Sequence, residues 1–341
     1  MHNPGVDARI AGWTAPGAPP ARSVAGLIAD GTLDPELAAI VWLLVEGHVP
    51  LVVGAGPRLT GKTTLLHALL DFLPPDIGTR EILGRAEDFS WLPDPLALGW
   101  PGEDVADLVG RLGEPEPVIA RPVSADARAS TAASALSGTP ASDAAIAPPE
   151  QTYLLCAELS HHAPFYTWGL RARVLIRSLQ LGYGLGATIH AESLADVFDL
   201  LMPPPVSLTD DEIRRLGMVL ILRRLSSGER RVVAAHYLRP VERDGEGHLQ
   251  RRPPVVLATW DPARDEFDHF GWGAAPELAL RVGRSQAEFE RELTLRAAFL
   301  REVVSAGRTS LPAFRAALAT YRGGGSAHTH PHPPSKAGPA S

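Results

Sequence analysis

Cysteine is almost absent from this chain of 341 residues, which contains a single copy, Cys156. One cysteine excludes an intramolecular disulfide and any cysteine-based metal cluster. Cys156 lies in an apolar run, residues 153–157, where a free cysteine acts as a small hydrophobic residue of a buried strand. A lone thiol is typical of a reducing compartment, so we expect a cytoplasmic protein.

Long apolar runs are missing as well. The most apolar stretch, residues 37–53, is interrupted by Glu46, His48 and Pro50, whereas a membrane-spanning helix needs about 20 predominantly apolar residues. The first residues do not show the charged and then apolar pattern of a secretory signal. We therefore expect no segment to span a membrane.

Positive charge is in deficit, because 39 acidic residues outnumber 32 basic ones and give a formal net charge of −7. A protein that binds duplex DNA through a broad surface has the opposite balance, so we do not expect nucleic acid as a partner. A nucleic-acid motor stays open as an alternative that would need a local basic channel. The hydrophobic fraction of 45% is ample for a globular core.

Lysine is the scarcest charged residue. Only two of the 32 basic residues are lysines, and one of them, Lys62, completes a G-x-x-x-x-G-K-[ST] pattern at residues 56–63. In such a P-loop, backbone N–H groups surround the α- and β-phosphates of a nucleotide, and the ammonium reaches the β- and γ-phosphates. The planar guanidinium of arginine is too wide for that position. We expect the following residues to bind ATP, with Thr63 also ligating Mg²⁺: Gly56, Pro57, Arg58, Leu59, Thr60, Gly61, Lys62, Thr63 and Thr64.

The flanks of this loop agree with the interpretation. Residues 49–54 read as a short buried strand, and residues 64–70 read as a helix with one apolar face. A strand, a glycine-rich loop and a helix form the arrangement that a phosphate site requires. The sequence therefore predicts nucleotide binding.

Strand and helix patterns alternate along the rest of the chain. Strand-like runs at 153–156 and 186–190 flank a helical stretch at 169–181, which predicts an α/β fold with a parallel sheet. From Met218 onward, short apolar runs separated by turn sequences predict an antiparallel extension of that sheet.

Helical patterns begin and end the ordered part of the chain. Residues 23–46 predict two helices, the second with Asp34 as N-cap and Pro35 at its first position. Segments rich in Ala, Ser, Pro and Gly hold too few large apolar side chains to pack. The expected parts are a flexible N-terminus (1–22), an ATPase domain (23–275) with an Ala/Ser/Pro-rich insertion (121–150), a C-terminal helical segment (276–322) and a disordered tail (323–341).

Three further candidates follow predicted strands. Glu158 ends the apolar run 153–157, Glu87 follows a weaker strand-like run, and His190 ends the run 186–189. Ligands of α/β folds bind at the carboxyl ends of strands, and ATP hydrolysis needs carboxylates near Mg²⁺ and the attacking water. Each candidate also has a structural alternative, a solvated strand-end carboxylate for the two acids and a hydrogen-bonded core histidine for His190.

Four motifs occur in a fixed order along the chain. They read GPRLTGKTT at 56–64, AED at 86–88, CAELS at 156–160 and ATIHAES at 187–193. This series resembles the ATPases of type II and type IV secretion and pilus assembly, especially the branch that serves Tad pili. That family shows GPTGSGKTT, an acidic box, VGEIR and ATLHANS in the same order. The likeness extends over residues 23–321.

The resemblance implies a RecA-like P-loop core and a motor subunit that hydrolyses ATP with Mg²⁺. It implies that Lys62 and Thr63 bind phosphate and Mg²⁺, and that Glu158 holds Mg²⁺ through water. Glu87 would activate water, and His190 would sense the γ-phosphate. The family also implies a homo-oligomeric ring, a hexamer, which docks on an inner-membrane platform protein and so associates with the membrane peripherally.

Some positions depart from the family pattern. Arg58 and Leu59 replace Thr and Gly in the loop, and Ser160 replaces the Walker B arginine. We also expect the large N-terminal domain of the family to be missing. These departures leave open a nucleotide-binding regulator or scaffold with little turnover. They also require an arginine from elsewhere to reach the γ-phosphate, and the candidates are Arg171, Arg173, Arg177, Arg223 and Arg224.

Overall fold

The computed structural model describes residues 21–56, 60–102, 147–163 and 165–324. Its central feature is a sheet of eight strands in the order β10-β9-β6-β5-β1-β4-β3-β2, with β7 and β8 forming a separate two-stranded sheet. The strands are β1 (Leu51–Gly54), β2 (Gly78–Ile82), β3 (Thr152–Leu159), β4 (Gly184–Ile189), β5 (Met218–Arg224), β6 (Arg230–Tyr237), β7 (Glu242–Arg243), β8 (Leu249–Gln250), β9 (Val255–Asp261) and β10 (Glu266–His269). This large and mostly parallel sheet between helices is compatible with a P-loop NTPase-like fold.

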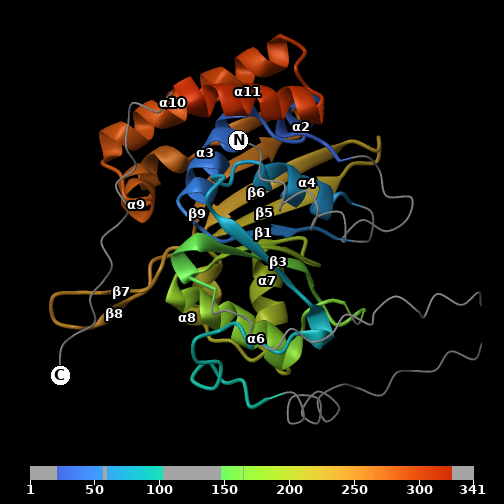
Figure 1. Ribbon diagram of the computed structural model, residues 1–341. Helices are drawn as coiled ribbons and strands as arrows, with labels where there is room; N and C mark the ends of the chain where they lie inside the picture. The colour runs from blue at the N-terminus through green and yellow to red at the C-terminus, as the bar shows by residue number, and fades with distance from the viewer. Residues whose placement is uncertain (1–20, 57–59, 103–146, 164, 325–341) are drawn as a thin grey trace, which may run out of the picture.

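The helices form two layers, one on each face of the sheet (Figure 1). One layer consists of α2 (Val24–Ala29), α3 (Pro35–Glu46), α4 (Lys62–Leu70), α9 (Ala275–Arg281), α10 (Gln286–Ser305) and α11 (Leu311–Gly324). The other consists of α6 (Gly169–Ser178), α7 (Leu194–Leu201) and α8 (Asp210–Ile213). Short 3₁₀ turns are η2 (Gly84–Ala86), η3 (Pro149–Gln151), η4 (Leu179–Leu181), η5 (Arg214–Leu216) and η6 (Gly271–Ala274). The helices predicted within residues 23–46, 64–70, 169–181 and 276–322 are confirmed.

Strand β5 divides the sheet into a parallel and an antiparallel part. It pairs parallel with β1 on one side and antiparallel with β6 on the other. The sequence patterns predicted that the antiparallel extension begins with β5. This prediction is wrong by one strand, because the antiparallel part begins with β6. The chain passes from β4 to β5 through α7 and α8, and a crossover of this kind joins parallel strands.

Each face of the sheet carries its own hydrophobic core. Leu51 and Val53 of β1 pack on the face that α3 and α4 cover, whereas Val52 packs on the face that α6 covers. Successive side chains of a strand point to opposite faces, and parallel sheets are covered on both. The strand therefore reads as a continuous apolar run in the sequence.

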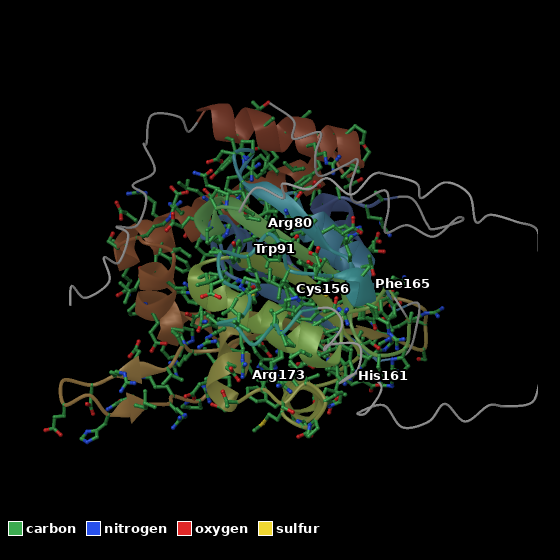
Figure 2. The ribbon with its side chains drawn as sticks, turned by 60° about the horizontal axis from the view of Figure 1, so that its bottom comes forward. Arg80, Trp91, Cys156, His161, Phe165 and Arg173 are labelled. Atoms are coloured by element: carbon green, nitrogen blue, oxygen red, sulfur yellow. The ribbon has the colours of Figure 1, made fainter. Side chains whose placement is uncertain are left out.

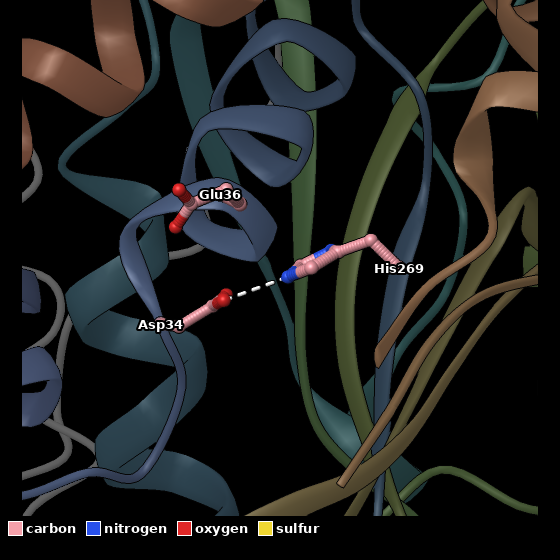
Figure 3. Close-up of side chains that lie close together, drawn as sticks. All are labelled: Asp34, Glu36 and His269. Carbon is pink, nitrogen blue, oxygen red and sulfur yellow. Dashed lines mark hydrogen bonds and ion pairs between the residues drawn. The ribbon is translucent and has the colours of Figure 1, made fainter. Parts of the chain in front are cut away.

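Helix α3 begins as predicted, with Pro35 as its first residue and Asp34 as its N-cap. One oxygen of Asp34 accepts a backbone N–H of the first helical turn, and the other lies 2.6 Å from His269 Nε2 (Figure 3). Glu36 lies beside this pair and contacts Arg301 of α10. Capping and ion pairing thus explain why two carboxylates and a histidine lie within 4.8 Å of one another, and they tie the start of α3 to β10 and α10.

The C-terminal helices complete the core that the N-terminal helices begin. α10 packs along α3, and Leu300 and Val303 of α10 join the core on the α3 and α4 face. The helical segment predicted at 276–322 therefore shares a core with the region 23–275.

Arg296 brings a buried positive charge to the interface of α3 and α10. Its guanidinium contacts Glu46, lies 3.5 Å from Glu292, and stacks 4.5 Å from the ring centroid of Trp42. Burial acts to raise the pKa of Glu46, but Arg296, with smaller contributions from Arg284 and Arg322, outweighs it and holds that pKa below its usual value. The two ions depend on each other, since an unpaired buried charge is costly.

Replacing Arg296 with alanine is expected to lower the free energy of unfolding by about 3 kcal/mol, because Glu46 then keeps a buried charge without its main partner. The matched control is Arg301→Ala on the same helix, whose side chain is 53% exposed, and we expect it to cost about 1 kcal/mol or less. Urea-induced unfolding of both variants measures the difference. Equal losses would show that the buried pair does not stabilise this interface.

Several predicted segments lie wholly or mostly outside the described residues. These are the flexible N-terminus up to residue 20, the insertion 121–150 apart from its last four residues, and the tail from residue 325 onward. Helix α11 continues to Gly324, two residues into the predicted tail. Within the described parts of the chain, no helix is long and apolar enough to cross a membrane.

Candidate functional site

The P-loop joins strand β1 to helix α4, which begins at Lys62 with Gly61 at the N-cap position. Gly61 has a φ of +98°, a left-handed conformation that favours glycine, and no side chain caps the helix. The N–H groups of the first turn are therefore directed out of the positive end of the helix, as an anion site requires. Three predicted ligand residues lie outside the described residues: Pro57, Arg58 and Leu59.

Parallel pairing brings two more predicted residues to this end of the sheet. β4 lies between β1 and β3, and its last residue, Ile189, is in register with Gly54 of β1 and with Leu159 of β3. Glu158 precedes Leu159, and His190 follows Ile189. The carboxyl ends of these three strands thus deliver the P-loop, Glu158 and His190 to one edge.

Lys62, Glu158 and His190 form a compact polar cluster. Lys62 Nζ lies 3.7 Å from Glu158 Oε1 and 3.4 Å from His190 Nδ1, while His190 Nε2 contacts Glu158 Oε1. An ammonium only donates, so Nδ1 of His190 accepts, and the proton of the neutral ring is on Nε2, facing Glu158. The three residues that the sequence assigned to phosphate, Mg²⁺ and γ-phosphate sensing are therefore in mutual contact.

Burial governs the charges of this cluster. Lys62 and Glu158 are each 6% exposed. Burial lowers the pKa of Lys62 below that of a free lysine, and the neighbouring Glu158 carboxylate opposes this shift. A buried ammonium needs an anionic partner. Glu158 is that partner for Lys62 here, in the place that a phosphate would take.

The residues that the sequence assigned to Mg²⁺ have oxygen atoms suited to a hard cation. Thr63 is the second residue of α4 and is half-buried, as is Thr64 after it. Glu158 reaches the Lys62 end of the same helix. Mg²⁺ prefers such hydroxyl and carboxylate oxygens and keeps several of its waters, so one hydroxyl and one carboxylate at the loop are a sufficient protein contribution.

Glu87 is buried, and its carboxylate is engaged within its own loop. Oε2 accepts the Leu83 N–H at 3.0 Å, and Oε1 accepts the Phe89 N–H at 3.1 Å and the Trp91 indole N–H at 2.8 Å. The Trp91 ring is in turn stacked by Arg80 of β2, with 5.0 Å to its centroid (Figure 2). Glu87 therefore holds this loop together, and its role in activating water stays a prediction.

The Glu87→Gln variant is expected to lower the free energy of unfolding by about 1–3 kcal/mol, because one of two oxygens that accept buried N–H groups becomes an NH₂ donor. Asp88→Asn changes the exposed neighbouring carboxylate and should cost about 0.5 kcal/mol or less. Thermal and urea unfolding measure both. If Glu87→Gln is as stable as the unmodified protein and loses only ATP turnover, Glu87 belongs to the reaction instead of the loop.

A cavity of about 760 Å³ opens beside the polar cluster. It is lined by Gly56 of the P-loop, by His162 and His190, and by the carboxylates of Glu192 and Asp199. The volume is typical of small-molecule sites. Its wall carries negative charge, which repels a polyphosphate. Binding of a polyphosphate here therefore needs the positive charges of the P-loop lysine and of a cation to offset that repulsion.

Several residues of this cavity were not among the predicted ligands, and two of them, His162 and Glu192, lie against predicted site residues. The His162 ring lies 5.4 Å from that of His190 and contacts Ser160, which stands where the family has an arginine. Glu192 lies so close to Gly56 that a Cβ there would collide with its carboxylate. Both residues are adjacent to predicted motifs in the sequence, but adjacency alone does not reveal which side chains turn toward the P-loop.

The arginines of α6 are bound within their own subunit. Arg171 Nε donates to the Glu87 carbonyl at 3.1 Å, Arg173 Nε to the Val206 carbonyl at 2.5 Å, and Arg177 Nε to the Glu212 carboxylate at 2.7 Å. Arg223 and Arg224, at the end of β5, are exposed, and their side chains have no partner among the described residues. Of the five predicted arginine candidates, these two are exposed and without a partner among the described residues.

Cys156 lies inside β3, as the sequence predicted (Figure 2). It is fully buried, and burial raises the pKa of its thiol to about 12. The thiolate, which is the reactive form, is therefore scarce at neutral pH, and Cys156 contributes packing instead of chemistry.

No family model matches the chain. Two uncharacterized proteins of Methanocaldococcus jannaschii are similar in sequence. MJ1287 is 26% identical over 289 residues, which cover 81% of this chain and 90% of that protein, and MJ0900 is 23% identical over 294 residues, which cover 83% of this chain and 46% of that protein. Among solved structures, the Legionella pneumophila ATPase DotB is similar with a TM-score of 0.28 and 10% identity, over 82% of this chain and 60% of that one. The chain thus spans most of one sequence relative and about half of the other.

Proposed function

We propose that this chain is a P-loop ATPase that binds ATP and Mg²⁺ at the carboxyl ends of β1, β4 and β3. One observation carries the proposal: the ammonium of Lys62, the carboxylate of Glu158 and the imidazole of His190 meet at the N-terminus of α4. A lysine for phosphate, an acid for the metal and its water, and a polar group for the γ-phosphate are the parts that ATP hydrolysis requires.

The strand order supports a RecA-like core. β1, which precedes the P-loop, and β3, which carries the acid, are separated by β4, which ends before His190. Neighbouring strands lie about 4.8 Å apart, so β1 and β3 are roughly 10 Å apart. The P-loop and the acid therefore follow strands that are one strand apart, with His190 at the end of the strand between them.

The residues have separate roles in the proposed reaction. Lys62 leaves Glu158 and binds the β- and γ-phosphates. The backbone N–H groups of the first turn of α4 bind the phosphates at the N-terminus of that helix. Thr63 and Glu158 would hold Mg²⁺, which would supply positive charge to the phosphate oxygens. Glu158, freed from Lys62, would accept hydrogen bonds from water near Thr63, and His190, which contacts both Lys62 and Glu158, would sense the γ-phosphate.

We further propose that the chain is a motor subunit of a secretion or pilus-assembly machine, working as a hexameric ring on an inner-membrane platform protein. The order of the four motifs supports this assignment. The exposed Arg223 and Arg224 support the ring, because they lie at the end of β5 that adjoins β1 and have no partner among the described residues. In the proposed ring, these two are our candidates for an arginine that acts on the nucleotide of a neighbouring subunit.

A nucleotide-binding regulator or scaffold is the second candidate function. Its supporting observations are the engagement of the Glu87 carboxylate within its own loop and the replacement of the Walker B arginine by Ser160. Such a protein binds ATP and assembles but scarcely turns it over. Measured ATP turnover, with and without membrane fractions that contain the platform protein, separates the two functions.

Two substitutions separate binding from hydrolysis. Lys62→Ala should abolish ATP binding, because it removes the cation that the phosphates contact. Glu158→Gln keeps the shape of the side chain and should retain ATP binding while lowering turnover by about 10² or more. Isothermal titration with Mg²⁺–ATP and a phosphate-release assay measure these effects, with circular dichroism as the control for folding. Unchanged affinity in Lys62→Ala would contradict the P-loop assignment.

Completion of the site by a neighbouring subunit predicts complementation. An Arg223→Ala/Arg224→Ala double variant should lose about 10³ in turnover if either side chain acts across the interface. Mixing it with Lys62→Ala should restore part of the activity, because the Lys62→Ala subunit supplies intact arginines to an intact P-loop. Arg251→Ala, an exposed arginine paired with Asp211, is the control.

The same mechanism makes specific activity depend on protein concentration. Turnover per subunit should fall on dilution, in step with the mass measured by light scattering. Constant turnover in a demonstrably monomeric sample would overturn the ring mechanism.

A further inference from the structure

The hairpin between β5 and β6 brings an arginine onto the P-loop. β5 runs parallel to β1, so its end and the turn at 225–229 lie at the same edge of the sheet as the P-loop. β6 starts there with Arg230, whose Nε donates to the carbonyl oxygen of Thr60 at 2.8 Å. The sequence patterns did not single out Arg230, because its partner is 170 residues away.

Gly61 allows this close approach. Arg230 Cδ and Nε both lie 2.9 Å from the place that a Cβ on Gly61 would occupy, which is closer than a real side chain permits. Arg230 therefore lies directly against the peptide group that joins Thr60 to Gly61. Its remaining N–H groups have no hydrogen-bond partner in the described part of the chain, so the bond to Thr60 is its main contact there.

The direction of this bond determines where the Gly61 N–H points. A trans peptide is planar, and its C=O and N–H point in opposite directions. Since the Thr60 carbonyl points toward Nε of Arg230, the Gly61 N–H points away from that side chain. In the sheet order β6-β5-β1-β4-β3, Arg230 approaches the P-loop from the strands on one side of β1, and Glu158 and His190 lie on the strands on the other side.

We propose that Arg230 is a positioning residue of the nucleotide site, which holds the Thr60–Gly61 peptide with its N–H turned toward the phosphates. The inference rests on the proposed function and deepens it. A P-loop binds anions through backbone N–H groups that all point at the ligand. If these groups already have that orientation in the free protein, binding does not have to order the loop and is therefore tighter. Arg230 provides this orientation for Gly61 through a hydrogen bond, not through its charge.

Two substitutions separate the hydrogen bond from the charge. In Arg230→Gln the amide nitrogen occupies the chain position of Arg Nε, so the variant keeps the donor and loses the charge. In Arg230→Lys a methylene occupies that position, so the variant keeps the charge and loses the donor. Affinity for Mg²⁺–ADP is expected to fall about 5- to 10-fold in Arg230→Lys and Arg230→Ala, and less than 2-fold in Arg230→Gln. Arg251→Ala serves as the surface control.

The peptide itself can be observed without any nucleotide. Thr60-Gly61 is the single Thr-Gly pair in the sequence. A protein labelled with ¹³C at threonine carbonyls and ¹⁵N at glycine therefore gives one carbonyl-edited amide signal, that of Gly61. We expect this signal to remain in place in Arg230→Gln and to shift or broaden in Arg230→Lys and Arg230→Ala, at unchanged melting temperature.

The outcomes are distinguishable. If Arg230→Lys binds like the unmodified protein and Arg230→Gln does not, the residue acts by charge, and the positioning role is overturned. The same conclusion follows if Arg230→Ala leaves the Gly61 signal and the affinity unchanged. If the unmodified protein binds no nucleotide, the proposed function fails, whereas the Gly61 signal still reports whether Arg230 orients the loop.

Discussion

The common direction of β1, β4 and β3 is the constraint on which the candidate site depends. Parallel strands end at the same edge of a sheet, so a lysine, an acid and a histidine that follow three separate strands meet there. Lys62 and His190 are 128 residues apart and yet lie within hydrogen-bond distance. Strands of this kind must be joined by crossovers, and the crossover after β1 begins with α4, the helix that carries Lys62. The connection from β1 through α4 thus both keeps the strands parallel and carries the lysine of the candidate phosphate site.

The charges of the site are buried, and this makes them interdependent. A lone ammonium or carboxylate in such a place would be costly, whereas a pair with suitable geometry balances much of its desolvation. Among the described residues, Lys62 therefore has one anionic partner, Glu158, which a phosphate would have to displace. The same exchange that would bind a nucleotide would free Glu158 for water and metal, so electrostatics would couple the two events.

Local signals in the sequence predicted much of the fold and of the site. The strand before the P-loop, the start of α3 at Asp34 and Pro35, and the position of His190 after a buried strand depend on near neighbours in the chain, and the structure agrees with them. The parallel direction of β5 was missed, because strand direction depends on the connection and not on composition. The contacts of Glu87 and of Arg230 were missed because hydrogen-bond partners are chosen in three dimensions, for Arg230 across 170 residues.

The packing of α10 against α3 has a consequence for how the protein is made. Arg296 pairs with Glu46 across 250 residues, so α3 is synthesised long before the helix that covers it. At about 5–20 residues per second, the ribosome needs roughly 12 to 50 seconds to make that interval. Throughout this time one apolar face of α3 has no permanent cover on the nascent chain. Chaperone binding and aggregation therefore compete with folding until the last helices emerge.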